Sequence, residues 1–277
     1  MNENFEHTTS SLSIIGSRVS HLESTTSTMD VAWELASEGA SDGTVVIADH
    51  QSAGRGRYDR SWVSRQAEDI LCSVLLRPRV ALAGELLMLA ALAVANVAEE
   101  FGVDVGIKWP NDVQVEGKKL AGVIAESKTG PELGNQDDAS SSDLDNGRVD
   151  RMTAVIGIGL NLNFNPELSS KVAPNSTSLA AELGRQLNRR EVFEKLMQSL
   201  DNHYKVITAG GTVLPEWRER ITTLGKQVTV VGGKWDGSKE LSGLAYDVDL
   251  LGRLIVQDKN GRNWPVSAGE VTVKDIR

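Results

Sequence analysis

The apolar run Val45–Ala48, typical of a buried β-strand, leads into Gln51-Ser52-Ala53-Gly54-Arg55-Gly56-Arg57-Tyr58-Asp59-Arg60-Ser61-Trp62. Three arginines and two glycines fall within nine residues of this segment. Glycine lets a backbone bend and approach a ligand closely. Guanidinium is a permanent, planar cation with several donors, suited to phosphate and carboxylate. We therefore predict an anion-binding loop after a strand. The alternatives are a solvated turn and an RNA-binding arginine–glycine segment.

Composition sets the class of protein. The chain has 277 residues, enough for one large domain or a large and a small one. With 40% apolar and 24% charged residues it has an ordinary globular balance. Lys and Arg total 29 against 38 Asp and Glu, a net charge of −9. That charge argues against general nucleic-acid binding and permits a small anion in a local basic pocket.

Cysteine, histidine and hydropathy constrain location and chemistry. The single cysteine, Cys72, lies in an apolar strand-like run, where a buried thiol is expected rather than a nucleophile. The four scattered histidines show no metal-binding spacing. The N-terminus lacks the basic and apolar regions of a signal peptide, and the apolar run Leu86–Ala95 is too short to span a bilayer. We expect a cytoplasmic protein without a membrane partner.

The pattern of apolar residues predicts the main elements. Ser27, a good N-cap residue, is expected to start a helix, since Met29, Ala32 and Leu35 follow near helical spacing. The clearest helix, at 84–101, is apolar nearly all round and should be buried. Further helices are predicted at 178–207 and 213–221, and strands at 44–48, 70–76, 105–109, 112–115, 120–126 and 154–162. Hairpins alternating with single helices favour an α+β fold over a doubly wound sheet.

Three segments differ from this core. Residues 1–20 are polar and predict a flexible tail. Residues 131–147 carry five acids, no base and no apolar anchor, which predicts a long surface loop or disorder. After Leu224, short strands at 227–231, 241–248, 253–257 and 264–266 alternate with glycine-containing turns, the pattern of a small β-barrel. The expected division is a tail over 1–20, a main domain over 21–222 and a small domain over 223–277.

Two further segments place cations at strand ends. Lys108-Trp109-Pro110-Asn111-Asp112 closes one predicted strand, and Lys119 opens the strand Lys119-Leu120-Ala121-Gly122-Val123-Ile124-Ala125-Glu126. Each could be an exposed turn. If both face the arginine loop, they complete a cationic pocket, in which Asp112 would hold Mg²⁺ or orient Lys108.

Taken in order and spacing, these segments resemble one family. Gln51–Trp62, Lys108–Asp112, Lys119–Glu126 and Gly157-Ile158-Gly159-Leu160-Asn161 are similar to the motifs of biotin–protein ligases (biotin–[acetyl-CoA-carboxylase] ligases). The resemblance covers roughly residues 20–277. It implies a class II synthetase-like domain with a mixed sheet and flanking helices, followed by an SH3-like barrel. It also implies that ATP and Mg²⁺ convert biotin to biotinyl-5′-AMP, and that biotin then passes to one lysine of a biotin carboxyl carrier domain.

The resemblance assigns roles to residues. For catalysis it implies Lys119, bridging the biotin carboxyl and the α-phosphate, together with Arg55 and Arg57. Around biotin it implies Ser27, Thr28, Gln51, Gly54, Arg55, Arg57, Lys119, Gly122, Gly157 and Leu160. Around ATP it implies Arg57, Arg60, Trp62, Lys108, Asn111, Lys119 and Asn161, with Trp62 stacked on adenine and Asp112 as a metal ligand.

Two departures and several rivals accompany this assignment. The family's first motif is commonly Ser-Thr-Asn but reads Ser27-Thr28-Met29 here, which leaves the asparagine contribution open while Ser27 and Thr28 remain. The overlapping Ser24-Thr25-Thr26 also leaves the register of this motif open by a few residues. About 20 polar residues precede this motif, too few for a DNA-binding helix-turn-helix, which favours the ligase-only form. The rivals are a lipoate–protein ligase and a non-catalytic biotin-binding module. The C-terminal barrel would either cap the main domain or help to close over ATP or dock the carrier. A monomer or weak homodimer is expected.

Overall fold

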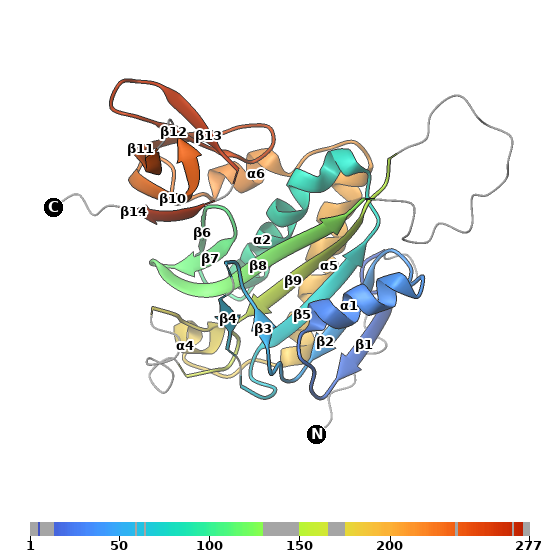
Figure 1. The fold of residues 1–277 in the computed structure, drawn as a ribbon. Coiled ribbons are helices and arrows are strands. Elements are labelled where there is room, and N and C mark those ends of the chain that lie inside the picture. Colours follow the sequence, from blue (N-terminus) through green and yellow to red (C-terminus); the bar gives the residue numbers. More distant parts are fainter. Residues whose placement is uncertain are drawn as a thin grey trace, which may run out of the picture.

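The computed structural model describes residue 5 and residues 14–58, 60–63, 65–129, 150–165, 175–235, 238–267 and 269–273. Two β-sheets organise this part of the chain (Figure 1). The larger is a seven-stranded mixed sheet, and the smaller is a five-stranded antiparallel sheet built from the C-terminal segment. The predicted α+β fold, a mixed sheet with flanking helices, is confirmed.

The large sheet has the order β1-β2-β5-β9-β8-β7-β6. Only β1 and β2 run parallel to each other, while the other neighbouring pairs are antiparallel. The bounds of its strands are β1 (Arg18–Leu22), β2 (Thr44–Ala48), β5 (Ile70–Leu76), β6 (Gly106–Lys108), β7 (Asp112–Val115), β8 (Lys118–Lys128) and β9 (Thr153–Leu160). The arginine-rich segment forms a separate two-stranded hairpin of β3 (Gly54–Arg55) and β4 (Ser61–Trp62).

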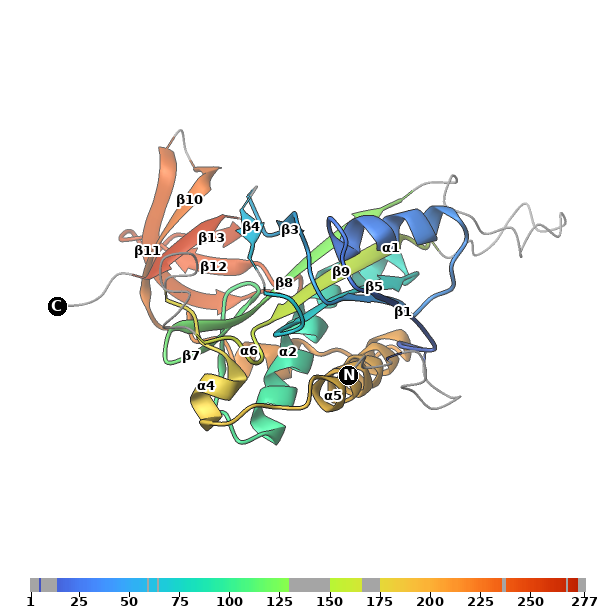
Figure 2. The same cartoon turned by 90° about the horizontal axis from the view of Figure 1, so that it is seen from below.

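Helices cover both faces of the large sheet (Figure 2). Helix α1 (Thr28–Ser37) begins after the predicted cap Ser27, whose hydroxyl accepts from the Met29 N–H, and packs on β5, β2 and β9. The opposite face carries α2 (Ala83–Glu100), preceded by η1 (Val80–Leu82), and α5 (Arg189–Thr208) packs against α2. Two short helices, α4 (Leu179–Leu183) and α6 (Leu214–Glu219), complete this layer. Among the described residues, α2 with η1 is the one helix long and apolar enough to cross a membrane, but here it is largely buried between the sheet and α5.

Strand alternation and one bulge decide which side chains face α1. On β9, Ile156, Ile158 and Leu160 belong to the core shared with α2, whereas Gly157 lies beneath α1. In the β7–β8 pairing, Val113 opposes Ala121 but Gln114 opposes Lys119, so one residue of β8 is skipped. Such a bulge re-aims side chains. It brings Lys119 to the face that carries Asp112 and Gly122.

The C-terminal segment forms a sheet in the order β13-β12-β11-β10-β14. Its strands are β10 (Gln227–Trp235), β11 (Ser238–Val248), β12 (Leu254–Gln257), β13 (Asn263–Val266) and β14 (Glu270–Val273). The predicted short strands are therefore present, together with β14, which the sequence did not reveal. Within the described residues no pairing joins the two edges β13 and β14, so the barrel expected from the sequence is not closed there. The sheet remains consistent with an SH3-like domain.

The prediction of a flexible tail over 1–20 is wrong for its described part. Residues from Arg18 onward pair in parallel with β2, and Phe5 and Ile15 are fully buried. Phe5 packs edge-on against Phe193 of α5, and the Asp201 carboxylate accepts from the backbone N–H groups of residues 14 and 15. The few apolar residues of this polar segment thus attach it to the core. The acidic segment 131–147 lies outside the described residues.

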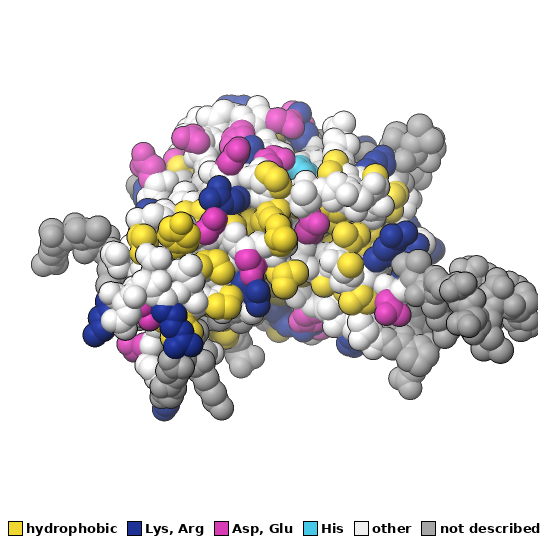
Figure 3. All heavy atoms as spheres, turned by 90° about the horizontal axis from the view of Figure 1, so that it is seen from above, with side chains coloured by type: hydrophobic (Ala, Val, Ile, Leu, Met, Phe, Trp, Pro, Cys, Tyr) yellow, Lys and Arg dark blue, Asp and Glu magenta, His cyan; other side chains and the backbone are white. Residues whose placement is uncertain are grey.

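The face of the molecule seen from above is amphipathic (Figure 3). Apolar side chains gather across the middle of this face, and charged side chains of both signs surround them.

Candidate active site

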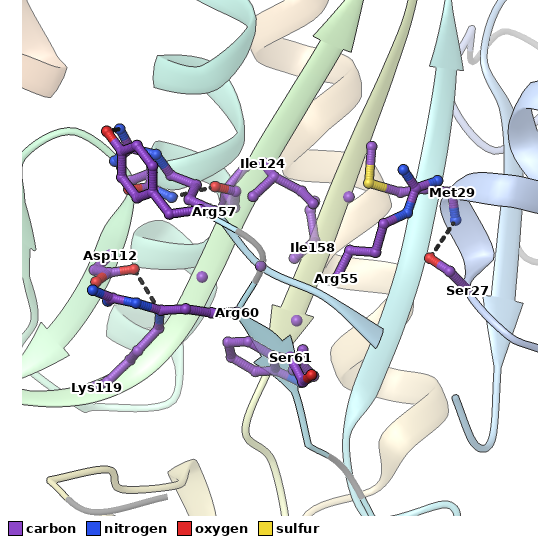
Figure 4. Close-up of a pocket in the computed structure, with 18 of the residues that line it drawn as sticks. Ser27, Met29, Arg55, Arg57, Arg60, Ser61, Asp112, Lys119, Ile124 and Ile158 are labelled. Atoms are coloured by element: carbon purple, nitrogen blue, oxygen red, sulfur yellow. Dashed lines mark hydrogen bonds and ion pairs between the residues drawn. The ribbon is translucent and has the colours of Figure 1, made fainter. Parts of the chain in front are cut away.

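A cavity of about 190 Å³ opens on the α1 side of the large sheet. Its lining comes from the β3–β4 hairpin with its connecting loop, from β7, β8 and β9, from the N-terminus of α1 and from the start of β14. Figure 4 labels lining residues from the hairpin, α1, β7, β8 and β9. Of the predicted site residues, the lining includes Ser27, Thr28, Gln51, Arg55, Arg57, Arg60, Trp62, Lys108, Asn111, Asp112, Lys119, Gly122 and Gly157. Residues far apart in the sequence are therefore gathered at one place.

A hydrogen-bonded polar cluster lies at the α1 end of the cavity. The side-chain oxygen of Gln51 accepts from the N–H of Thr28 at 2.7 Å and from its hydroxyl at 3.0 Å. The Thr28 hydroxyl also lies 2.8 Å from the hydroxyl of Ser73 on β5. Ser73 is fully buried, and sequence reasoning missed it because a serine inside an apolar strand carries no motif. The cluster offers a ligand uncharged donors and acceptors with fixed positions.

Small residues shape a slot beside this cluster. A Cβ atom at Gly157 would lie 2.8 Å from the Met29 sulfur and 3.1 Å from Cγ1 of Ile124. Real Cβ atoms essentially never approach as closely as 2.8 Å, so a larger residue at position 157 would require the Met29 side chain to shift. Met29, which replaces the family's asparagine, therefore gives this wall an apolar surface.

Trp62 of the hairpin lies on the glycines of β8 and β9. A Cβ at Gly159 would come within 2.5 Å of the indole ring, and a Cβ at Gly122 within 3.0 Å. The Lys119 ammonium stands 5.3 Å from the ring centroid, within the range of a cation–π contact. The buried indole N–H of Trp62 has no hydrogen-bond partner within the described part of the chain. The aromatic face expected for adenine thus lies at the cationic end of the cavity.

The cationic end is built around β7 and β8. Lys119 forms an ion pair with Asp112 at 2.7 Å, a partner that differs from both alternatives predicted for Asp112. Asn111, which is buried, donates to the carbonyl of Val123 at 2.5 Å and accepts from Arg57 at 3.1 Å. Arg57 is thereby linked to the sheet through Asn111, and its guanidinium stacks 5.0 Å from the ring centroid of Tyr58.

The other two arginines of the loop engage carboxylates at the rim. Arg55 pairs with Asp30 of α1 and with Glu126 of β8. Arg60 pairs with Glu270 of β14. The C-terminal sheet therefore contributes to the pocket, where Gly269, Glu270 and Val271 line the wall. Sequence reasoning missed these residues because β14 was not predicted.

Three predicted site residues do not line the cavity. Leu160 alternates onto the opposite face of β9 and is buried in the core shared with α2. Gly54 lets β3 approach β4, since a Cβ there would lie 2.5 Å from the carbonyl of Trp62. The Asn161 amide donates to the backbone carbonyls of Lys119 at 3.2 Å and Thr177 at 2.9 Å. Gly54 and Asn161 thus support the wall from behind.

Burial raises the pKa of two side chains in or next to β5. Burial raises the pKa of the Cys72 thiol to about 12, which keeps it neutral and unreactive, as expected for a buried strand cysteine. Asp69, just before β5, is buried and accepts from the Leu162 N–H, and burial raises its pKa to about 7. No group of three His, Cys, Asp or Glu side chains able to hold a metal occurs among the described residues.

Comparison with known proteins identifies a family to which this set of pocket residues corresponds. The profile of the Biotin/lipoate A/B protein ligase family matches residues 21–135. The biotin–[acetyl-CoA-carboxylase] ligase of Mycobacterium tuberculosis is 34% identical over 253 residues, which cover 87% of this chain and 83% of that protein. The chain belongs to the biotin–protein ligase family.

Two further relatives are similar to this chain in sequence or in fold. The bifunctional ligase/repressor of Bacillus subtilis is 32% identical over 197 residues, and the match spans 69% of this chain but only 55% of that protein. The chain thus spans about half of the longer bifunctional relative. In fold, it is similar to the biotin protein ligase of Aquifex aeolicus solved with biotin and ATP, with a TM-score of 0.71 and 24% identity over 92% of this chain and 98% of that one.

Proposed function

We propose that the chain activates biotin as biotinyl-5′-AMP and transfers it to a lysine of a carrier domain of acetyl-CoA carboxylase or a related carboxylase. One observation carries the proposal. The cationic side chains of Arg57, Arg60, Lys108 and Lys119 line one cavity together with the polar cluster around Gln51. Such a cavity suits a neutral polar head at one end and two anions at the other.

The first step joins two anions. The biotin carboxylate attacks the α-phosphorus of ATP, the bond from that phosphorus to the bridging oxygen breaks, and pyrophosphate leaves. Fixed cations offset the repulsion between carboxylate and triphosphate and stabilise the charge that develops in the transition state. We assign Lys119 to the meeting point of the two anions because it stands between Trp62 and Asp112. Arg57, Arg60 and Lys108 would hold the phosphates.

The remaining contacts place biotin and adenine. Gln51, Thr28 and Ser27 would bind the polar parts of biotin, while Met29, Gly157 and Ile124 would enclose its apolar parts. Trp62 would stack on adenine at the cationic end. Gly122 leaves room for this stack, since a Cβ there would lie 3.0 Å from both the indole ring and the Lys119 ammonium.

The second step requires protection of the intermediate. An acyl adenylate hydrolyses when water reaches it, so the arginine loop should cover the product until the acceptor lysine arrives. The amine of that lysine then attacks the acyl carbon, an amide forms, AMP leaves with the bonding electrons, and the amine proton passes to solvent. Arg57 would retain the adenylate through its link to Asn111.

We propose Mg²⁺ as an ion that arrives with ATP. Asp112 remains the candidate protein ligand, although its partner in this structure is Lys119. We further propose a cytoplasmic enzyme, monomeric or weakly dimeric, whose macromolecular partner is the carrier domain rather than a nucleic acid or membrane.

Isotope exchange between pyrophosphate and ATP tests the first step. Exchange should require biotin and fail with lipoate in its place. Exchange with lipoate alone would replace the proposal by a lipoate–protein ligase, and no exchange with either acid would favour a non-catalytic biotin-binding module. Deleting the residues after Leu224 and repeating the exchange and the transfer separately would show which step needs the C-terminal sheet.

A further inference from the structure

Three charged side chains from three elements meet at the rim of the slot. Arg55 of β3 donates to Asp30 of α1 and, at 3.2 Å, to Glu126 of β8. Both carboxylates are held by a second donor. The hydroxyl of Thr26 donates to Asp30 at 3.3 Å, and the indole N–H of Trp33 donates to Glu126 at 2.8 Å. Together they form a continuous bridge from α1 to β8 with β3 at its centre.

The bridge runs over the apolar slot rather than toward the cationic end. In Figure 4 the Arg55 side chain extends toward Met29 and Ser27, on the side of the pocket away from Lys119 and Asp112. Met29 belongs to the same α1 turn as Asp30, and it lies over Gly157. The charge of Arg55 is thus engaged by carboxylates of α1 and β8, whereas Lys119, at the other end of the pocket, pairs with Asp112 and lies beside the aromatic ring of Trp62.

We propose that Asp30 and Glu126 are positioning residues that hold Arg55, and with it β3, across the mouth of the slot. The proposal rests on the proposed function, in which biotin occupies that slot. A ligand in the slot can leave on this side only when the bridge opens. The bridge therefore sets how fast biotin dissociates, while the phosphate contacts at the other end are untouched.

The solvent exposure of the three side chains determines how strongly the bridge should slow biotin dissociation. Their side chains are 38% (Arg55), 51% (Asp30) and 42% (Glu126) exposed, so solvent screens both ion pairs. Exposed pairs of this kind correspond to a change of about two- to fivefold in a rate when one is removed. Because both pairs share Arg55, their effects are not expected to multiply. Screening also predicts faster dissociation at higher salt.

Biotin dissociation, followed by chasing labelled biotin from the full chain at low and high salt, tests the proposal. The variants are Asp30→Asn, Glu126→Gln and the double variant, which keep the hydrogen-bond acceptors for Thr26 and Trp33. Glu34→Gln, a charge removed one turn further along α1, is the matched control. We expect about two- to fivefold faster dissociation for each variant, no change for the control, and a salt response that the double variant loses.

Wild-type dissociation rates in both single variants, or a salt response that persists in the double variant, would overturn the proposal and leave the proposed function intact. If the unmodified chain bound no biotin, both the proposed function and the proposed role of the bridge would be wrong. Because the salt response of the unmodified chain is measured without any substitution, misfolding of a variant cannot decide the outcome. A rate that does not change with salt in the unmodified chain would overturn the bridge directly.

Discussion

Replacing Arg57 by glycine should leave adenylate formation possible but let the intermediate escape. In the structure the Arg57 guanidinium donates to the side-chain oxygen of buried Asn111 at 3.1 Å. A hydrogen bond with one charged partner contributes roughly 1.5–3 kcal/mol. Since about 1.4 kcal/mol is a factor of ten, its loss predicts release of biotinyl-5′-AMP roughly 10- to 150-fold faster than from the wild type.

Two assays measure this escape. Rapid separation of free from bound labelled adenylate gives the release rate, and biotinylation of a bystander protein such as serum albumin reports the leaked intermediate. Arg57→Ala separates loss of the guanidinium from added backbone freedom and should leak nearly as fast. Arg65→Gly, at an exposed arginine after the hairpin, is the control and should not leak. Wild-type release with no bystander labelling from Arg57→Gly would refute the role given to Arg57.

Three further predictions concern Lys119, Gly157 and Asp69. Lys119→Gln should lower biotin-dependent pyrophosphate exchange by about 10²- to 10³-fold, the usual effect of removing one group that stabilises transition-state charge. A rate of exchange within about tenfold of wild type would contradict the catalytic role assigned to Lys119. Gly157→Ala should weaken biotin binding in calorimetry because the new methyl group meets Met29, and Met29→Ala in the same chain should restore it; no recovery would place the slot elsewhere. Asp69 keeps its proton in the folded state up to about pH 7 but loses it near pH 4 when unfolded, so its contribution to the unfolding free energy falls as pH rises between those values. Asp69→Asn retains the acceptor for the Leu162 N–H but cannot titrate, so its unfolding free energy, measured by urea titration, should fall less between pH 4 and 7 than that of the wild type. An equal pH dependence in the two proteins would argue against a raised pKa of Asp69.

Apolar patterning was sufficient to predict most of the large sheet. The strands at 44–48 and 70–76 were predicted with their observed bounds because both lie in continuous apolar runs. Strand β1 was missed, since Ser20 and His21 interrupt its apolar pattern and its stability comes from pairing with β2. Strand β14 was missed for a similar reason, because Glu270 and Thr272 alternate with valines in a segment too short to stand out.

The site was predictable where a motif carried charge and not where tertiary pairing decided the geometry. The arginines, Lys108 and Lys119 were predicted from composition and spacing at strand ends. The partner of Asp112 depends on a bulge in the β7–β8 pairing, which no local pattern reveals. The contacts of Arg55 with Asp30 and Glu126 join segments 25 and 71 residues apart in sequence, so only the fold brings them together.

The most direct test of the central claim is whether the chain makes and keeps an adenylate. The chain is incubated with biotin and ATP labelled in the α-phosphate, then separated from small molecules by gel filtration, and the bound label is identified after denaturation. We predict biotinyl-5′-AMP bound in near-stoichiometric amount, dependent on biotin and discharged by an acceptor carrier domain. Protein that carries no label, or only AMP formed without biotin, would contradict the account.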